Sequence, residues 1–364
     1  MTISLQKLLA LCLLTCICNL AFASPKIKVA FINPAPKGNN FWDIAVSFMQ
    51  ASADDLGIDL NILYTPTFHR SESFKNTIKL LESADKPDYL IAIFQKRTTL
   101  KLLRLSEKHQ VDFYSINTQV PEESKACSGK PREFYKYWLG HSVPNDKLAG
   151  YLAAKDLIAS FKKNNTKSSI IQLLAISGGR DSSASFDRNT GLFQALKEHP
   201  DVTINQLVHT DWSTSNAYIK TKGLLKRYPK TNIIWAANDA IALGVSQAIT
   251  GQPIITAGID WSKKGITAVQ EGKLLSTYGG HFAEGGLALV MLYDYFHGLD
   301  FIKDPGLSSY TSFAKIDLTN IDHFNTILTE QNWQSINFRN FSKAINPSLD
   351  KYDFSWENMF RNIE

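Results

Sequence analysis

Polar and aromatic residues gather just after the apolar segments of this chain that we predict to be strands. In an open parallel sheet, ligands bind beyond the carboxyl ends of the strands, so chemistry is expected at these positions. The first half of the chain contributes Asn39, Phe41, Trp42, Gln95 and Asn117. The second half contributes Arg188, Trp212, Asn238, Asp260, Trp261 and His281.

These residue types suit a ligand that is rich in hydroxyl groups. A planar amide, carboxylate or guanidinium can meet two neighbouring hydroxyls at once. An aromatic face can cover the C–H side of a sugar ring. A mostly apolar cleft with a few convergent polar groups is also the general form of a small-molecule site. The sequence therefore predicts a carbohydrate-like small molecule as the ligand.

Several of these residues have a structural alternative that the sequence leaves open. Asn39 and Asp239 stand where helices are predicted to begin and could cap them. Arg188 could pair with an aspartate of its own loop, and a lone histidine such as His281 is more often structural. We favour a functional role for Trp212, because a large aromatic residue in a loop has less structural reason to be there. The same argument favours function for Trp261.

The sequence motifs of the common enzyme classes are missing. The chain has no G-x-S-x-G, no P-loop, no H-E-x-x-H and no G-x-G-x-x-G after a predicted strand. The eight histidines show no metal-ligand spacing, and Cys127 has no cysteine partner for a metal. We therefore predict a protein that is not an enzyme, with no cofactor and no metal. A secreted α/β enzyme remains an alternative.

The residues above are placed by short β-branched segments that alternate with amphipathic helices. Continuous apolar strands separated by such helices indicate parallel sheets covered on both faces. Residues 120–132, rich in proline and charge, interrupt the pattern and read as a connection. We predict two consecutive doubly wound α/β units. The predicted strands are 27–33, 59–64, 89–94, 112–117, 169–176, 202–210, 232–237, 254–259 and 274–278.

The N-terminus has the three parts of a secretory signal in order. Lys7 precedes an apolar stretch over residues 8–20, and Ala21-Phe22-Ala23 follows as an A-x-A cleavage signal. We predict cleavage after Ala23 and export of residues 24–364. A short membrane anchor or a buried core helix is the alternative. Three of the four cysteines lie in this segment, which leaves Cys127 without an internal disulfide partner.

Net charge argues against nucleic acid as a partner. Lys and Arg number 39 against 34 Asp and Glu, which gives +5, and no basic run concentrates that charge. A nucleic-acid-binding protein of this size would show a basic face.

The chain resembles a known family, the type I periplasmic binding proteins for sugars, of the ribose-binding kind. The resemblance extends from about Ile27 to Asp317. It rests on motifs in a fixed order: Asn39-Asn40-Phe41-Trp42, Ser185-Phe186-Asp187-Arg188-Asn189-Thr190-Gly191, Ala237-Asn238-Asp239-Ala240-Ile241-Ala242-Leu243-Gly244, Gly258-Ile259-Asp260 and Val269-Gln270-Glu271-Gly272-Lys273-Leu274.

The resemblance implies roles for particular residues. Phe41 and Trp42 match the aromatic pair that sandwiches the sugar, and Trp212 matches a further aromatic wall. The polar ligands of the family match Asn117, Arg188, Asn238 and Asp260.

Two departures limit the identification of the ligand. Asn117-Thr118 replaces the Asp-Arg of the family, and Gly280 beside His281 replaces its late Gln. Phe41-Trp42, Asn117-Thr118 and Trp261 look closer to the autoinducer-2 receptor, which has Arg where Gly280 stands.

The resemblance also implies two lobes joined by a three-crossover hinge that closes around the ligand. We expect the N-terminal lobe to comprise 24–120 and about 282–306, and the C-terminal lobe about 133–281 and 307–341. Crossovers are expected near 119–132, 279–282 and 304–309. The tail, 342–364, is expected to pack on a lobe surface.

The implied partner is an inner-membrane ABC permease that reads the closed form in the periplasm. A membrane sensor kinase or cyclic-dinucleotide enzyme is the alternative. The protein itself is expected to be a monomer, and Trp42→Ala and Arg188→Ala are expected to abolish ligand binding with little effect on folding.

Overall fold

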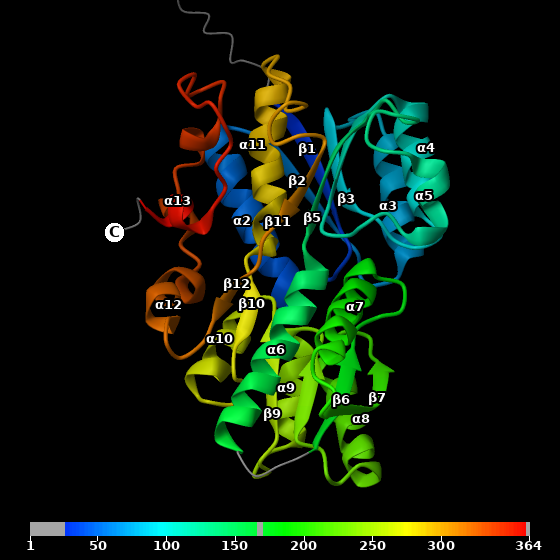
Figure 1. Ribbon diagram of the computed structural model, residues 1–364. Coiled ribbons are helices and arrows are strands. Elements are labelled where there is room, and N and C mark those ends of the chain that lie inside the picture. The colour runs from blue at the N-terminus through cyan, green and yellow to red at the C-terminus, as the bar shows by residue number, and fades with distance from the viewer. Residues whose placement is uncertain (1–25, 166–169, 362–364) are drawn as a thin grey trace, which may run out of the picture.

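The computed structural model describes residues 26–165 and 170–361, which form two lobes, one above the other in Figure 1. The predicted signal peptide and its cleavage site lie outside the described residues. Among the described residues, no helix has the length and apolar character needed to cross a membrane.

Each lobe is built on one six-stranded sheet, as the two doubly wound units predicted from the sequence require. The first sheet is parallel throughout, and in the second only the edge strand β12 is antiparallel to its neighbour. The first sheet has the order β11 (Ser308–Thr311), β5 (Trp138–Pro144), β4 (Asp112–Ile116), β3 (Tyr89–Ile93), β1 (Lys28–Asn33), β2 (Asp59–Tyr64). The second has the order β12 (Ala314–Ile316), β10 (Thr277–Gly279), β9 (Ile255–Ile259), β8 (Ile233–Ala236), β6 (Ile171–Ser177), β7 (Val202–His209).

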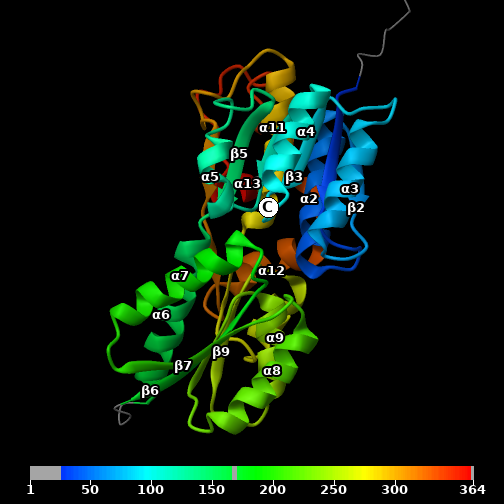
Figure 2. The same ribbon diagram turned by 90° about the vertical axis from the view of Figure 1, so that its right-hand side faces the viewer.

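Helices cover both faces of each sheet (Figures 1 and 2). The first lobe has α2 (Asn40–Leu56), α3 (Arg70–Leu81), α4 (Thr99–His109), α5 (Glu122–Ser128) and α11 (Glu284–Phe296). The second has α6 (Asp146–Asn164), α7 (Ser183–Lys197), α8 (Thr214–Arg227), α9 (Asp239–Ala248) and α10 (Lys263–Gln270). The central strand β8 is buried at every position, which explains its continuous apolar sequence.

Helices α6 and α7 lie unusually close because glycines face the contact. A Cβ at Gly150 would lie 2.1 Å from the carbonyl oxygen of Arg188, and one at Gly191 would lie 2.0 Å from that of Lys147. No other residue type fits at these two positions without moving a helix. The close approach fixes Arg188, on the middle turns of α7, against the start of α6.

Two of the expected lobe boundaries are wrong. Strand β5 pairs with β4, so residues 138–144 belong to the first lobe, and the first crossing lies between Pro144 and Asp146 rather than within 119–132. Strand β11 pairs with β5, so the third crossing lies at residues 312–313 rather than near 304–309. In the first sheet β5 lies between β4 and β11, so both strands extend that sheet beyond β4 and depend on pairing that the local sequence does not show. The chain also passes between the lobes from β10 to α11.

A further crossing follows near the C-terminus. Helix α12 (Ile321–Glu330) contacts α10 of the second lobe, whereas the short helices η3 (Trp333–Ser335) and η4 (Phe338–Phe341) contact α2 of the first. The last helix, α13 (Trp356–Phe360), lies beside the first lobe near the junction (Figure 1). The C-terminal segment thus spans both lobes.

Candidate ligand-binding site

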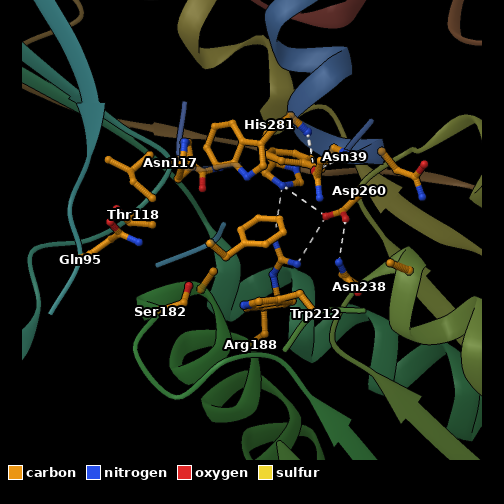
Figure 3. A pocket seen from close by; sticks show the side chains of 18 of the residues that line it. Asn39, Gln95, Asn117, Thr118, Ser182, Arg188, Trp212, Asn238, Asp260 and His281 are labelled. Carbon is orange, nitrogen blue, oxygen red and sulfur yellow. Dashed lines mark hydrogen bonds and ion pairs between the residues drawn. The ribbon is translucent and has the colours of Figure 1, made fainter. Parts of the chain in front are cut away.

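A cavity of about 170 Å³ lies between the lobes, at the carboxyl ends of both sheets. Its lining includes every residue that the sequence analysis singled out except Trp261. Figure 3 shows Gln95, Asn117 and Thr118 on one side of the cavity and Arg188 and Trp212 on another. The residues brought together are Asn39, Phe41, Trp42, Gln95, Asn117, Arg188, Trp212, Asn238, Asp260 and His281.

Asn39 places the aromatic residues of the first lobe by capping α2. Its Oδ1 accepts hydrogen bonds from the backbone N–H groups of Phe41 at 3.1 Å and Trp42 at 2.9 Å, so the capping role that the sequence left open is present. Both aromatic residues therefore fall in the first helical turn and face the cavity. Phe41 stacks on His281 at 4.6 Å between ring centroids and meets Trp42 edge-on at 5.1 Å.

Arg188 is held by three groups of the second lobe. Its Nε donates to Asp146 Oδ1 at 2.6 Å and its Nη1 donates to the Ala237 carbonyl oxygen at 2.8 Å. Nη1 also lies 3.6 Å from Asp260 Oδ1. Burial opposes the charge of the guanidinium, but Asp146 and Asp260 outweigh it, so the pKa of Arg188 is raised. The expected alternative partners on its own loop do not bind it in this structure.

His281 is neutral for a reason visible in its contacts. Its Nε2 lies 3.3 Å from Nη2 of Arg188, and a guanidinium can only donate, so Nε2 accepts. Burial and the nearby Arg188 charge lower the pKa of His281 well below its usual value. Burial likewise raises the pKa of Asp260 well above its usual range, with Arg188 opposing the shift.

Asn238 is both a cap and a wall residue. Its Oδ1 accepts from the backbone N–H of Ile241 at 2.9 Å, which caps α9, and its Nδ2 donates to Asp260 Oδ2 at 3.2 Å. The neighbouring Asp239 faces away, accepting from Ser262 and Thr277, in agreement with a structural rather than a ligand role.

Trp212 lies flat over a pair of glycines. A Cβ at Gly178 would lie 2.2 Å from its six-membered ring, so this ring reaches the cavity only because position 178 has no side chain. The backbone of Trp212 has φ +67°, an unusual conformation for a large residue and one found at functional sites. The guanidinium carbon of Arg188 lies 5.9 Å from the ring centroid.

Gln95 and Asn117 project from loops of the first lobe that Thr118 fastens together. Thr118 Oγ1 donates to the Phe94 carbonyl oxygen at 2.7 Å and accepts from the Phe94 N–H at 2.8 Å. Asn117 has φ +66°, and its backbone N–H donates to the buried Glu284 at 2.9 Å. Neither amide side chain of Gln95 and Asn117 makes a hydrogen bond to another described residue, so both are available to a ligand.

Trp261 does not reach the cavity. It is fully buried, with its ring centroid 5.2 Å from that of Phe324 and 5.6 Å from that of Trp356. Asp260 occupies the cavity wall, and the backbone of Trp261, at φ +58°, carries its side chain to the other side, over Gly279. The sequence expectation of a ligand role for Trp261 is therefore not supported by its position.

Sequence reasoning missed several residues of the site. Phe313, in the third crossing, lies 4.7 Å from the His281 ring, and it escaped notice because that crossing was expected elsewhere. Asp146, the main partner of Arg188, is an acidic residue in the first turn of α6. That position was the sequence signal that could have drawn attention to it. Phe68, Asp181 and Ser182 also line the cavity.

Three polar contacts join the two lobes at the mouth of the cavity. In each contact, a residue in a loop or at a helix start of the first lobe bonds to a residue of the second lobe. The second-lobe residue lies in the loop before α7 or in the first turn of α7. They are Arg70 Nη1 to Asp181 Oδ2 at 3.5 Å, Lys96 Nζ to the Arg180 carbonyl oxygen at 3.0 Å, and the Gln119 N–H to Ser183 Oγ at 2.9 Å.

Two parallel-sheet lobes around a cavity lined by aromatic residues and a few convergent polar groups define a small-molecule binding protein of the two-lobe type. Residues 29–299 match the family described as "Periplasmic binding protein domain", and the chain belongs to the type I periplasmic binding proteins. Among the described residues, no cluster of histidine, cysteine and carboxylate side chains could hold a metal ion.

Similar proteins share the fold over most of the chain. A periplasmic sugar-binding protein from Pseudomonas fluorescens is 32% identical with a TM-score of 0.82, over 92% of this chain and 100% of that one. The D-allose-binding periplasmic protein of Escherichia coli K12 is 22% identical over 266 residues, 70% of this chain and 80% of the relative. An ABC transporter solute-binding protein from Actinobacillus succinogenes 130z, with bound D-allose, is 18% identical with a TM-score of 0.71, over 82% of this chain and 100% of that one.

Proposed function

We propose that this protein binds an uncharged monosaccharide in the inter-lobe cavity, in the periplasm, without performing chemistry on it. The observation that supports this most directly is the pairing of Arg188. It is the only Arg or Lys among the described lining residues, and it already forms a buried ion pair with Asp146 at 2.6 Å. The guanidinium therefore offers hydrogen-bond donors to a hydroxylated ligand without an uncompensated charge for an anion.

The size of the cavity argues for a single sugar ring. Its volume of about 170 Å³ is below the roughly 300–1,000 Å³ of pockets that take drug-sized ligands. The free amides of Gln95 and Asn117 and the aromatic faces of Phe41 and Trp212 supply both kinds of contact that a sugar needs. The sugar-binding relatives are consistent with this ligand class.

We further propose that binding closes the lobes. The ligand would contact Gln95 and Asn117 of the first lobe and Arg188 and Trp212 of the second, so it favours the state in which both sets are near. The three contacts across the mouth form only in that state. A membrane ABC permease then receives the sugar from the closed form, as the family's transport members suggest.

The proposal is tested by calorimetry and thermal shift on the exported protein with D-allose, D-ribose and D-glucose. D-glucuronate, which differs from D-glucose by one carboxylate, is the charged control. A sugar at about 100 times its Kd adds about 2.7 kcal/mol to the free energy of unfolding. Stabilisation by a neutral sugar and none by D-glucuronate is expected. Stabilisation by D-glucuronate alone, or by none of the compounds, would overturn the assignment.

The transport role is tested separately by deleting the gene and following uptake of the sugar that binds. Loss of uptake at micromolar sugar is expected. Unchanged uptake with intact binding would reject the transport role and favour a receptor that acts on a membrane sensor.

A further inference from the structure

The C-terminal segment is fastened to the first lobe after it leaves α12. Trp333 Nε1 donates to Ser47 Oγ of α2 at 3.0 Å. The buried carboxylate of Asp294, on α11, accepts from the Lys343 N–H and from the Tyr352 hydroxyl, both at 2.7 Å. Lys343 and Tyr352 are thus bound to the first lobe on either side of residues 344–351. The chain then reaches α13 at the junction between the lobes.

Trp356, the first residue of α13, contacts both lobes at once. Its ring centroid lies 5.6 Å from that of Trp261, which follows β9 of the second lobe. It lies 5.3 Å from Phe282, in the crossing from β10 to α11, and 6.3 Å from Phe48, on α2 of the first lobe. Its contacts thus connect one lobe, the other lobe and one of the crossings.

Trp356 also lies directly behind the cavity wall. A Cβ at Gly280 would lie 2.3 Å from Trp356 Nε1, and Gly280 has φ +110°, a conformation that other residues rarely adopt. Gly280 immediately precedes His281, and Trp261 immediately follows Asp260. The indole therefore rests on the chain neighbours of two cavity residues without lining the cavity itself.

We propose that Trp356 is a positioning residue that stabilises the closed arrangement of the lobes. It acts through Gly280 on His281 and through Trp261 on Asp260. Because opening rotates the first lobe away from the second, we expect the contacts of Trp356 to Trp261 and to Phe48 to be weakened in an open state. The C-terminal segment then adds stability to the closed state in the ligand-free protein. The link to His281 and Asp260 rests on the proposed sugar site, whereas the effect on the lobes does not.

The test compares ligand-free Trp356→Ala with the wild type by small-angle X-ray scattering. Phe354→Ala is the matched control: it truncates an aromatic residue of the same segment whose ring contacts are Phe341 and Tyr352, both of that segment. A larger radius of gyration is expected for W356A and an unchanged one for F354A. Equal radii for all three proteins would overturn the proposal, as would the same increase in both variants.

A second variant covers the case in which W356A does not fold. Trp356→Phe keeps an aromatic ring between Trp261 and Phe282, so it is expected to rescue the compact radius partly. Positioning by the ring is rejected if the radius of gyration of W356F is as large as that of an open protein. It is also rejected if W356F and W356A both have the radius of the wild type. The scattering measurement needs no sugar, so it tests the role of Trp356 even if no sugar binds. A failure of the proposed function can therefore be told apart from a failure of this proposal. Where a test sugar such as D-allose binds, faster dissociation is expected from W356A and not from F354A.

Discussion

The Nε atom of Arg188 lies 2.6 Å from Oδ1 of Asp146, and both side chains are about 4% exposed. The pair joins the start of α6 to the middle of α7, where glycines let the helices meet. A buried charge of this kind is maintained by its partner, because desolvation penalises each charge alone. The cation at the cavity wall is therefore also part of the structure of the second lobe.

Arg188→Ala is expected to destabilise the protein as well as to abolish binding. It leaves Asp146 and Asp260 buried without a cation, and breaking a buried pair in this way costs about 3–5 kcal/mol. This geometry replaces the sequence-based expectation that folding would stay intact. Urea unfolding measures the loss. A free energy of unfolding within 1 kcal/mol of the wild type would show that the pair contributes little, and Lys125→Ala, at the exposed Lys125–Glu122 ion pair, serves as the control.

Gln95→Ala offers a cleaner test of the cavity. Its side chain lines the cavity and makes no hydrogen bond to another described residue, so truncation leaves the fold in place. One lost hydrogen bond to a ligand costs about 0.5–1.5 kcal/mol, or about 2- to 13-fold in Kd. Calorimetry with the sugar that binds measures the change. Gln247→Ala, on an exposed position of α9, is the matched control, and equal affinities for the two variants would remove Gln95 from the site.

The strand-end rule predicted most of the residues that line the cavity, because Trp212 and Asn238 lie in the loops directly after β7 and β8 and Asn39 lies in the loop between β1 and α2. The same rule failed at Trp261, since two consecutive residues after β9 cannot both face the cavity. Backbone angles at Asp260 and Trp261 decide which one does, and no residue pattern shows those angles. The sequence analysis expected the tail that carries Trp356 to pack on a lobe surface, but it could not place this residue at the junction between the lobes.

The lobe boundaries failed for a different physical reason. The sequence analysis did not predict β5, because its segment WLGHSVP contains Gly140, His141 and Ser142 and is not a continuous apolar run. β5 pairs with β4 because residues 120–137 return the chain to that side of the first sheet. This contact is tertiary, so no local sequence pattern predicts it. The alternation of strands and helices therefore predicted the two units, whereas their exact limits depended on contacts distant in sequence.

Gly178→Ala is expected to weaken binding through Trp212. The added methyl would lie 2.2 Å from the indole ring, so the ring must move out of its place in the cavity wall. Gly223→Ala is the control: a Cβ there, in α8, meets nothing within 4 Å and is expected to stabilise the helix by about 0.5–1 kcal/mol. Calorimetry and thermal melts of both variants separate the two effects. Unchanged affinity in G178A would show that the position of Trp212 does not matter to the ligand.

The stability of the fold is expected to depend on pH through the buried carboxyl of Glu284. Burial raises its pKa from 4.5 to about 8, with the hydrogen bond from the Asn117 N–H acting in the opposite direction. Between pH 4.5 and 8 the folded protein therefore retains a proton at Glu284 that the unfolded chain has lost. The folded state binds more protons in this window, so the free energy of unfolding falls as pH rises. The stabilising contribution is complete below pH 4.5 and is lost as pH passes 8, with a slope of up to about 1.4 kcal/mol per pH unit.

Glu284→Gln isolates this contribution from those of other groups. The amide cannot titrate, but its oxygen can still accept from the Asn117 N–H. Burial also raises the pKa values of Asp112 and Asp187 to about 6, so the wild type depends on pH for more than one reason. The contributions of Asp112 and Asp187 cancel in the difference between the free energies of unfolding of the wild type and E284Q. From pH 5 to pH 8 the wild type is expected to lose stability relative to the variant. Urea unfolding across that range measures it. Parallel curves for the two proteins would mean that Glu284 is already ionised in the folded state, and that the buried carboxyl behind Asn117 carries a charge.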